Sequence, residues 1–172
     1  ILRFTICPAF RLFFSRAMRD LSESHRPLTS IFNTEETDAE FFLSAEQLNF
    51  FNENGYLSGI KILDNSQIET LRDALSQLMF PDQSANPLFY EYHHNESGDP
   101  DNALVHALGA WRAAEASHHL RFHRAVTIPS SQLLGGQPRF WHDQLFVKPA
   151  RDGAVVAWHQ DYSYWIRTKP MA

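Results

Sequence analysis

Residues 155–165 read Val-Val-Ala-Trp-His-Gln-Asp-Tyr-Ser-Tyr-Trp, and this stretch says most about the fold. Its valines and aromatic side chains predict a β-strand. Residues two apart on a strand point to the same face of a sheet, so we expect His159 and Asp161 to project side by side. An imidazole and a carboxylate presented together are two of the three side chains in the 2-His-1-carboxylate set that holds non-haem Fe(II).

The spacing of His159 and Asp161 is common by chance. On spacing alone, a surface His–Asp pair on an edge strand is the simpler interpretation. The β-branched and aromatic neighbours favour a strand packed into a sheet, where a buried carboxylate needs a partner. The flanking residues therefore favour a functional pair.

Length and composition place the chain in a broad class. Its 172 residues suffice for one domain with a hydrophobic core. A formal net charge of −5 argues against nucleic acid as the main partner. No apolar run reaches the roughly 18 residues that span a membrane. The single cysteine, Cys7, excludes an intrachain disulfide and fits a reducing compartment, so we expect a cytoplasmic location.

The first 40 residues are predicted to form a flexible or targeting-like segment. Residues 1–19 contain four arginines and no acid, a composition similar to a mitochondrial transit peptide, which leaves a mitochondrial location open. The chain begins with Ile1, and Met18 is an alternative start. Residues 41–172 are predicted to form one domain.

The first predicted helix has clear ends. Ser44 and Gln47 match a capping box, which predicts a helix over Ala45–Asn54. Gly55 suits the left-handed conformation that ends a helix. A short strand is expected to follow at Tyr56–Ile60.

The middle of the chain predicts more helix and one loop. Ser66 and Glu69 form a second possible capping box, before a helix that Pro81 ends. Residues 81–100 are interpreted as a loop and residues 103–124 as helical. That helix would contain several histidines, which we interpret as surface or packing residues: His106, His118, His119 and His123.

Gly135 and Gly136 mark a turn, after which residues 139–147 alternate as a strand does. One face of this strand would present Trp141, Leu145 and Val147. The other would present Phe140, His142, Gln144, Phe146 and Lys148. A strand with a partly polar inner face suits a barrel that encloses a ligand.

Two motifs together resemble a known family. Residues 140–149 read Phe-Trp-His-Asp-Gln-Leu-Phe-Val-Lys-Pro, and residues 158–165 read Trp-His-Gln-Asp-Tyr-Ser-Tyr-Trp. In this order and separation they closely resemble the phytanoyl-CoA dioxygenase family. The resemblance covers about residues 41–172, the N-terminal half of such a domain. It implies an α+β fold, a double-stranded β-helix (jelly roll), incomplete here, with N-terminal helices packed on the sheet.

The resemblance also implies a chemistry. Members require Fe(II), 2-oxoglutarate as co-substrate and O₂, and they hydroxylate a small organic or lipid-like substrate. By position, His159 and Asp161 would be metal ligands, and Gln144 and Gln160 would bind the co-substrate. Gln160 is the weaker assignment because strand alternation points it away from the metal. His142 would line the pocket or pack in the core, and Lys148 would attract an anionic group or reach solvent.

The family's third ligand, a histidine, and the arginine that anchors 2-oxoglutarate belong to the second half of the jelly roll. Since the sequence stops at Ala172, we expect a fragment that is inactive alone. Its open sheet edge would be covered by the missing half or by another chain. The alternative is a catalytically silent jelly-roll binding or interaction module from a truncated product. Zinc at the same ligands, as in a hydrolase, fits the pattern less well.

Overall fold

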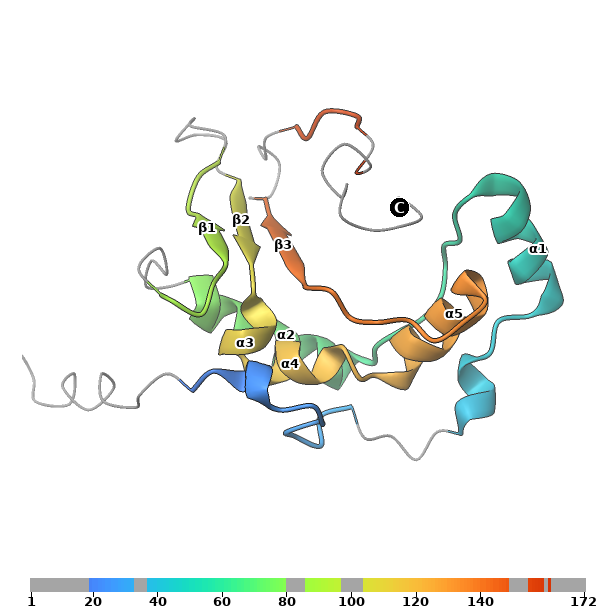
Figure 1. Cartoon of the computed structure of the whole chain (residues 1–172), viewed down its shortest axis with the longest axis horizontal. Coiled ribbons are helices and arrows are strands. Elements are labelled where there is room, and N and C mark those ends of the chain that lie inside the picture. The colour runs from blue at the N-terminus through green and yellow to red at the C-terminus, as the bar shows by residue number, and fades with distance from the viewer. Residues whose placement is uncertain are drawn as a thin grey trace, which may run out of the picture.

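The computed structural model describes residues 19–32, 37–79, 86–96, 104–148, 155–159 and 161. Within these ranges the elements are two short 3₁₀ helices, η2 and η3, followed by five α-helices and three β-strands (Figure 1). Their bounds are η2 Leu21–Glu23, η3 Asp38–Phe41, α1 Ala45–Asn54, α2 Asn65–Met79, β1 Glu91–His93, β2 Val105–Leu108, α3 Ala110–Ala113, α4 Glu115–Leu120, α5 Arg124–Leu134 and β3 Gln144–Val147.

The strands form one antiparallel sheet in the order β1-β2-β3. His93 of β1 lies opposite His106 of β2, which in turn lies opposite Phe146 of β3. Side chains that are directly opposite in an antiparallel ladder share a face. One face therefore carries these aromatic and polar groups, and the other carries the next residues along each strand.

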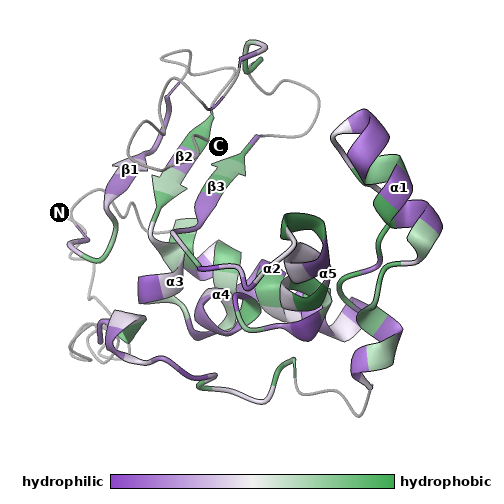
Figure 2. Cartoon of the chain, turned by 45° about the vertical axis from the view of Figure 1, so that its right-hand side comes forward, coloured by the Kyte–Doolittle hydropathy of each residue, from purple (hydrophilic) through white to green (hydrophobic). Residues whose placement is uncertain are grey.

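The second face of the sheet covers the hydrophobic core. Ala107 of β2 is buried against Leu78 of α2, Phe89 and Ala110 of α3, and Tyr92 and Leu145 pack on the same cluster. Figure 1 shows α2, α3 and α4 below the sheet, and Figure 2 shows β2 as mostly hydrophobic and β1 as mostly hydrophilic. The helices thus close one side of the sheet and leave the His106 face uncovered by them.

Asp143, the residue just before β3, holds the corner between β2 and α3. Its two carboxylate oxygens accept hydrogen bonds from the backbone N–H groups of Gly109, at 2.9 Å, and Trp111, at 2.7 Å. The first N–H groups of a helix have no partner within it, so this side chain caps α3 from another element. Burial raises the pKa of the Asp143 carboxyl, while both backbone hydrogen bonds act in the opposite direction.

The segment before residue 40 is packed where the structure describes it. Leu21 and Phe32 are each only 4% exposed. Asp20 pairs with Arg112 of α3, and the guanidinium holds the pKa of that carboxyl well below its usual range. The division at residue 40 remains a prediction, but residues 19–32 are not a loose leader. The arginine-rich stretch up to residue 18 lies outside the described residues.

The first predicted helix is confirmed with both its ends. Ser44 and Gln47 form the reciprocal capping box, and Gly55 ends α1 with φ +78°. For α2 the predicted cap is wrong by two residues. Asp64 accepts from the backbone N–H of Gln67, whose side chain accepts from the backbone N–H of Asp64. Asp64 is the better acceptor for this reciprocal pair because its carboxylate is charged. Helix α2 ends at Met79, and Pro81 lies outside the described residues.

Three predictions about the middle of the chain are wrong. Residues 56–60 form no strand, residues 81–100 contain β1, and residues 103–124 contain β2 followed by the short helices α3 and α4. Gly109, with φ +105°, separates β2 from α3, and a Cβ there would meet the carbonyl oxygen of Leu88 at 3.0 Å. Pairing with two neighbouring strands overrides the helical propensity of residues 104–108.

The observed architecture is α+β, as predicted, with helices packed on an antiparallel sheet. In the part of the chain that the structure describes, the sheet has three strands, so the jelly roll itself stays a proposal. None of the described helices combines the length and apolar character that crossing a membrane requires.

Replacing Asp143 by alanine should lower the free energy of unfolding by about 1–3 kcal/mol, because two backbone N–H groups lose their acceptor. Urea denaturation followed by circular dichroism measures this. Asp143→Asn, which keeps one acceptor oxygen, should lie between alanine and wild type. The exposed Asp73→Ala on α2 is the control and should change stability by less than about 0.5 kcal/mol. Equal losses in Asp143→Ala and Asp73→Ala would contradict the capping role.

Candidate functional site

His159 and Asp161 lie side by side, as the sequence predicts. The Nε2 atom of His159 is 3.3 Å from Oδ1 of Asp161, and the side chains are 47% and 69% exposed. In the described part of the predicted strand, residues 155–159 have no regular secondary structure, and Trp158 is fully exposed. Residues 160 and 162–165 lie outside the described residues. A strand is stabilised by a hydrogen-bonded neighbour, and the sheet of the described part, β1-β2-β3, does not include this segment.

A backbone contact sets the tautomer of His159. Its Nδ1 lies 2.8 Å from the carbonyl oxygen of Ala157, and a carbonyl can only accept, so Nδ1 carries the hydrogen. In the neutral ring Nε2 then holds the lone pair and faces the Asp161 carboxylate. Metal-bound histidines typically use this arrangement, with the second ring nitrogen donating to a carbonyl.

The donor chemistry of this pair suits a cation. A lone pair and a carboxylate oxygen that face each other at 3.3 Å repel unless a proton or a metal ion lies between them. Imidazole and carboxylate are the donor types of non-haem Fe(II) sites. The two residues fit an iron ion as two of its three expected protein ligands.

Gln144, the predicted co-substrate residue, is the first residue of β3 and is exposed. Its Nε2 lies 2.9 Å from Nε2 of His106 on β2. An amide nitrogen has two hydrogens, so one can donate to His106 while the other reaches a carboxylate. Gln160 lies outside the described residues. Lys148 is exposed, and His142 is half-buried and donates from Nδ1 to the carbonyl oxygen of Asp143 at 3.0 Å.

Sequence reasoning missed a second group of ligand-type side chains. Glu91, His93 and His106 each place one ligand atom within 4.8 Å of those of the other two. The sequence contains a signal, a glutamate and a histidine two residues apart. It was overlooked because residues 81–100 were interpreted as a loop and His106 as helical.

The three histidines near α4 are packing residues, as predicted. His118, His119 and His123 are at most 3% exposed. His119 is within 2.7 Å of the Thr29 hydroxyl, and Phe32 packs against the rings of His119 and His123. Burial lowers the pKa of His118 and His119 because the interior disfavours the charged ring. These imidazoles hold residues 19–32 against α4.

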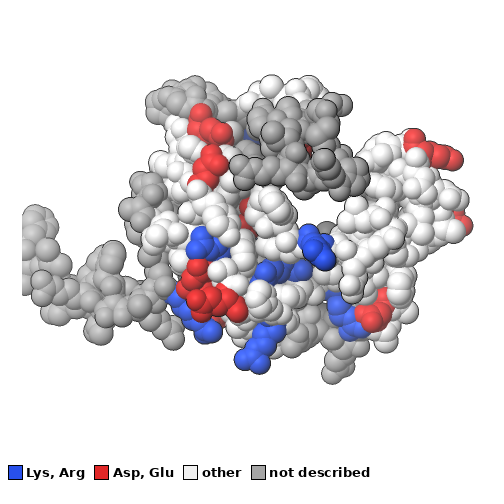
Figure 3. Space-filling model, in the orientation of Figure 1, with Lys and Arg blue, Asp and Glu red and all other residues white. Residues whose placement is uncertain are grey.

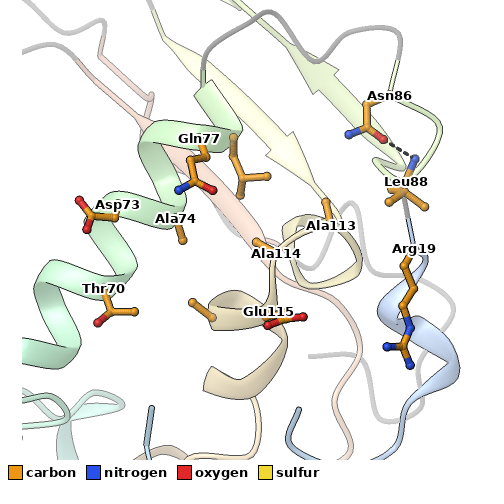
Figure 4. Close-up of a pocket in the computed structure, with 12 residues that line it drawn as sticks. Arg19, Thr70, Asp73, Ala74, Gln77, Asn86, Leu88, Ala113, Ala114 and Glu115 are labelled. Atoms are coloured by element: carbon orange, nitrogen blue, oxygen red, sulfur yellow. Dashed lines mark hydrogen bonds between the residues drawn. The ribbon is translucent and has the colours of Figure 1, made fainter. Parts of the chain in front are cut away.

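A separate hollow of about 560 Å³ lies between α2, the turn at Asn86–Leu88 and the α3–α4 junction (Figure 4). Arg19, Asp73 and Glu115 are its charged residues, and Thr70 and Gln77 of α2 also line it. Neither His159, Asp161 nor Gln144 contributes to its lining. The hollow is therefore distinct from the candidate site.

With this geometry established, comparison with known proteins decides the family. The sequence profile of the family described as phytanoyl-CoA dioxygenase matches residues 51–172, which include both motifs and the candidate site. The chain belongs to this family. Membership makes an Fe(II)- and 2-oxoglutarate-type dioxygenase chemistry the family-level expectation.

A curated relative agrees with this placement. The chain is 28% identical over 128 residues to the ectoine dioxygenase of Halomonas elongata. The alignment covers 74% of this chain but only 37% of the relative. The chain thus spans about a third of the length of this curated relative.

The buried histidines predict a pH dependence of stability. A base whose pKa is lowered by folding binds fewer protons in the folded state, so stability is lost as pH falls below the unfolded-state value of about 6.5. Urea denaturation at pH 7.5 and pH 5.5 measures this. His119→Gln should lose less stability on acidification than wild type does.

The control is the exposed His94→Gln, which should lose as much stability on acidification as wild type. An unchanged pH dependence in His119→Gln would show that burial of this ring does not contribute.

Proposed function

We propose that the complete protein is an Fe(II)- and 2-oxoglutarate-dependent dioxygenase that hydroxylates a small organic or lipid-like substrate. The observation that carries the proposal is the geometry of the His159–Asp161 pair. The Nδ1–H of His159 donates to the Ala157 carbonyl, and its Nε2 faces the Asp161 carboxylate. Membership of the phytanoyl-CoA dioxygenase family supports it. When bound, iron would supply the activation of O₂.

His159 and Asp161 would hold the metal through Nε2 and a carboxylate oxygen. The Ala157 carbonyl keeps the imidazole in the tautomer that binds metal and limits its rotation. A third ligand, a histidine from the second half of the jelly roll, is part of the proposal. The exposure of both side chains agrees with a site that further residues of the complete protein cover.

Gln144 would orient 2-oxoglutarate. One amide hydrogen would donate to His106 and so fix the Gln144 side chain. The other would donate to a carboxylate oxygen of the co-substrate. Gln160 is a second proposed contact to the co-substrate, taken from the family motif. Holding the co-substrate in one orientation makes an otherwise bimolecular reaction effectively unimolecular. Such positioning is the main contribution of a protein to a reaction whose chemistry a metal supplies.

The substrate is a small molecule by family analogy. Ectoine, named in the relative's description, is a reasonable first compound to test. The jelly-roll fold and its completion at the open sheet edge, by further sequence or by another chain, are parts of the same proposal. A cytoplasmic location is also proposed, with a mitochondrial one as the alternative.

Asp161→Ala in the complete protein should abolish succinate formation from 2-oxoglutarate in the presence of Fe(II), because the metal loses its anionic ligand. Succinate released per minute is the readout, with bound iron measured in parallel. The exposed Asp73→Ala is the control and should retain wild-type turnover. Near-normal turnover in Asp161→Ala would overturn the ligand assignment. A wild type that binds no iron would favour the silent binding module.

Gln144→Leu should raise the KM for 2-oxoglutarate by roughly 10-fold, the usual effect of losing one hydrogen bond to a charged group. The exposed Gln137→Leu, which lies between α5 and β3, is the control with the same change of side chain. Initial rates at varied 2-oxoglutarate concentration test this. If both variants have the same KM, Gln144 does not contact the co-substrate.

A further inference from the structure

The sheet face opposite the helices gathers a second set of metal-ligand side chains. Glu91 and His93 are two apart on β1, so they share a face, and His93 lies directly opposite His106 on β2. The ligand atoms of these three residues lie within 4.8 Å of one another. Two imidazoles and one carboxylate thus converge from two neighbouring strands.

The contacts inside this group are those of a preformed site. His93 Nε2 lies 2.6 Å from Glu91 Oε1, and a second carboxylate, that of Glu96, lies 3.1 Å from His106 Nδ1. The acidic side chains along the β1 edge are visible in Figure 3. Two carboxylates held beside two imidazoles concentrate negative potential at one point, and this favours a bound cation.

His106 is the buried member, and its ring is held on both sides. It is 8% exposed and stacks between His93, at 5.9 Å between ring centroids, and Phe146, at 4.5 Å. Gln144 contacts its Nε2 at 2.9 Å. Its buried Nδ1 faces the Glu96 carboxylate and forms no hydrogen bond of regular geometry. A ring nitrogen and a carboxylate oxygen that face each other at this distance need a proton or a coordinated cation between them.

We propose that Glu91, His93 and His106 bind a divalent transition-metal ion such as Zn(II), at a site separate from His159 and Asp161, with Glu96 as an additional carboxylate. Imidazole nitrogens select transition metals over Mg²⁺ and Ca²⁺, which prefer oxygen ligands. Gln144 lies at the other ring nitrogen, Nε2. For an ion to bind at Nδ1, Nε2 would have to carry the hydrogen, and the Gln144 amide would have to turn so that its oxygen accepts it.

A metal ion at this site would also stabilise the pairing of the short strand β1 with β2. Strand β1 has three residues, two of which are these ligands, and its central residue Tyr92 packs on the core cluster. An ion that joins β1 to His106 of β2 would link the two strands on the face opposite the core. Because it binds the folded state alone, the metal should raise the melting temperature.

The test uses the full-length protein with His159→Ala and Asp161→Ala, so that the other candidate site does not bind. Co(II), read by its visible absorption, and Zn(II), read by calorimetry, are titrated into metal-free protein. We expect one equivalent to bind and the melting temperature to rise. His93→Gln in this background should weaken binding by roughly 10-fold or more. Loss of a residue that merely orients a ligand already weakens metal binding by about 10-fold, and this variant loses a ligand itself.

His94→Gln is the matched control, because His94 is the exposed neighbour of His93 and lies outside the cluster. It should bind as tightly as the background protein. Absence of binding in the background, or equal affinities in His93→Gln and His94→Gln, would overturn the proposal. Glu91→Gln, an exposed change that the fold should tolerate, should weaken binding too. These outcomes are independent of succinate formation, so they separate this site from the proposed dioxygenase site.

Discussion

The Asp143 carboxylate is the interaction on which the arrangement of the sheet depends. It accepts from Gly109 and Trp111 at the start of α3, and the next residue along the chain begins β3. One side chain therefore joins the end of β2, the start of α3 and the start of β3. Buried backbone N–H groups are costly to leave unsatisfied, so the position of β3 next to β2 follows from this contact.

Because side chains alternate along each strand, one face of the sheet packs on the core and the other carries the ligand-type side chains. Ala107 and Leu145 lie on the face that packs against α2 and α3, whereas His106, Gln144 and Phe146 lie on the other. The chemical groups are thus held by strands whose opposite face is fixed in the core. This arrangement holds the polar side chains in place on a face that is separate from the core cluster.

The two candidate metal-binding groups use the same local rule in different settings. Glu91 and His93 are two residues apart on a paired strand. His159 and Asp161 are also two residues apart but converge without a strand, with the Ala157 carbonyl orienting the imidazole. A hydrogen bond to one ring nitrogen can replace the sheet in directing the other nitrogen to a metal.

The sequence by itself determined the features whose causes are local. The capping box of Ser44 and Gln47 and the left-handed Gly55 set the ends of α1. The period-2 pattern predicted for residues 139–147 set the faces of β3, although the strand itself covers only Gln144–Val147. The motif around His159 and Asp161 indicated both the family and the proximity of the two side chains. Each of these depends on residues a few positions apart.

Only the tertiary structure decided the features that depend on distant partners. Residues 104–108 have a pattern that fits a helix, but pairing with β1 and with β3, more than thirty residues further on, makes them a strand. That pairing brings His106 to His93 and Gln144, so the second candidate metal site could not be predicted from sequence. Local propensities differ by less than about 1 kcal/mol per residue, and the hydrogen bonds and burial of a paired strand outweigh them.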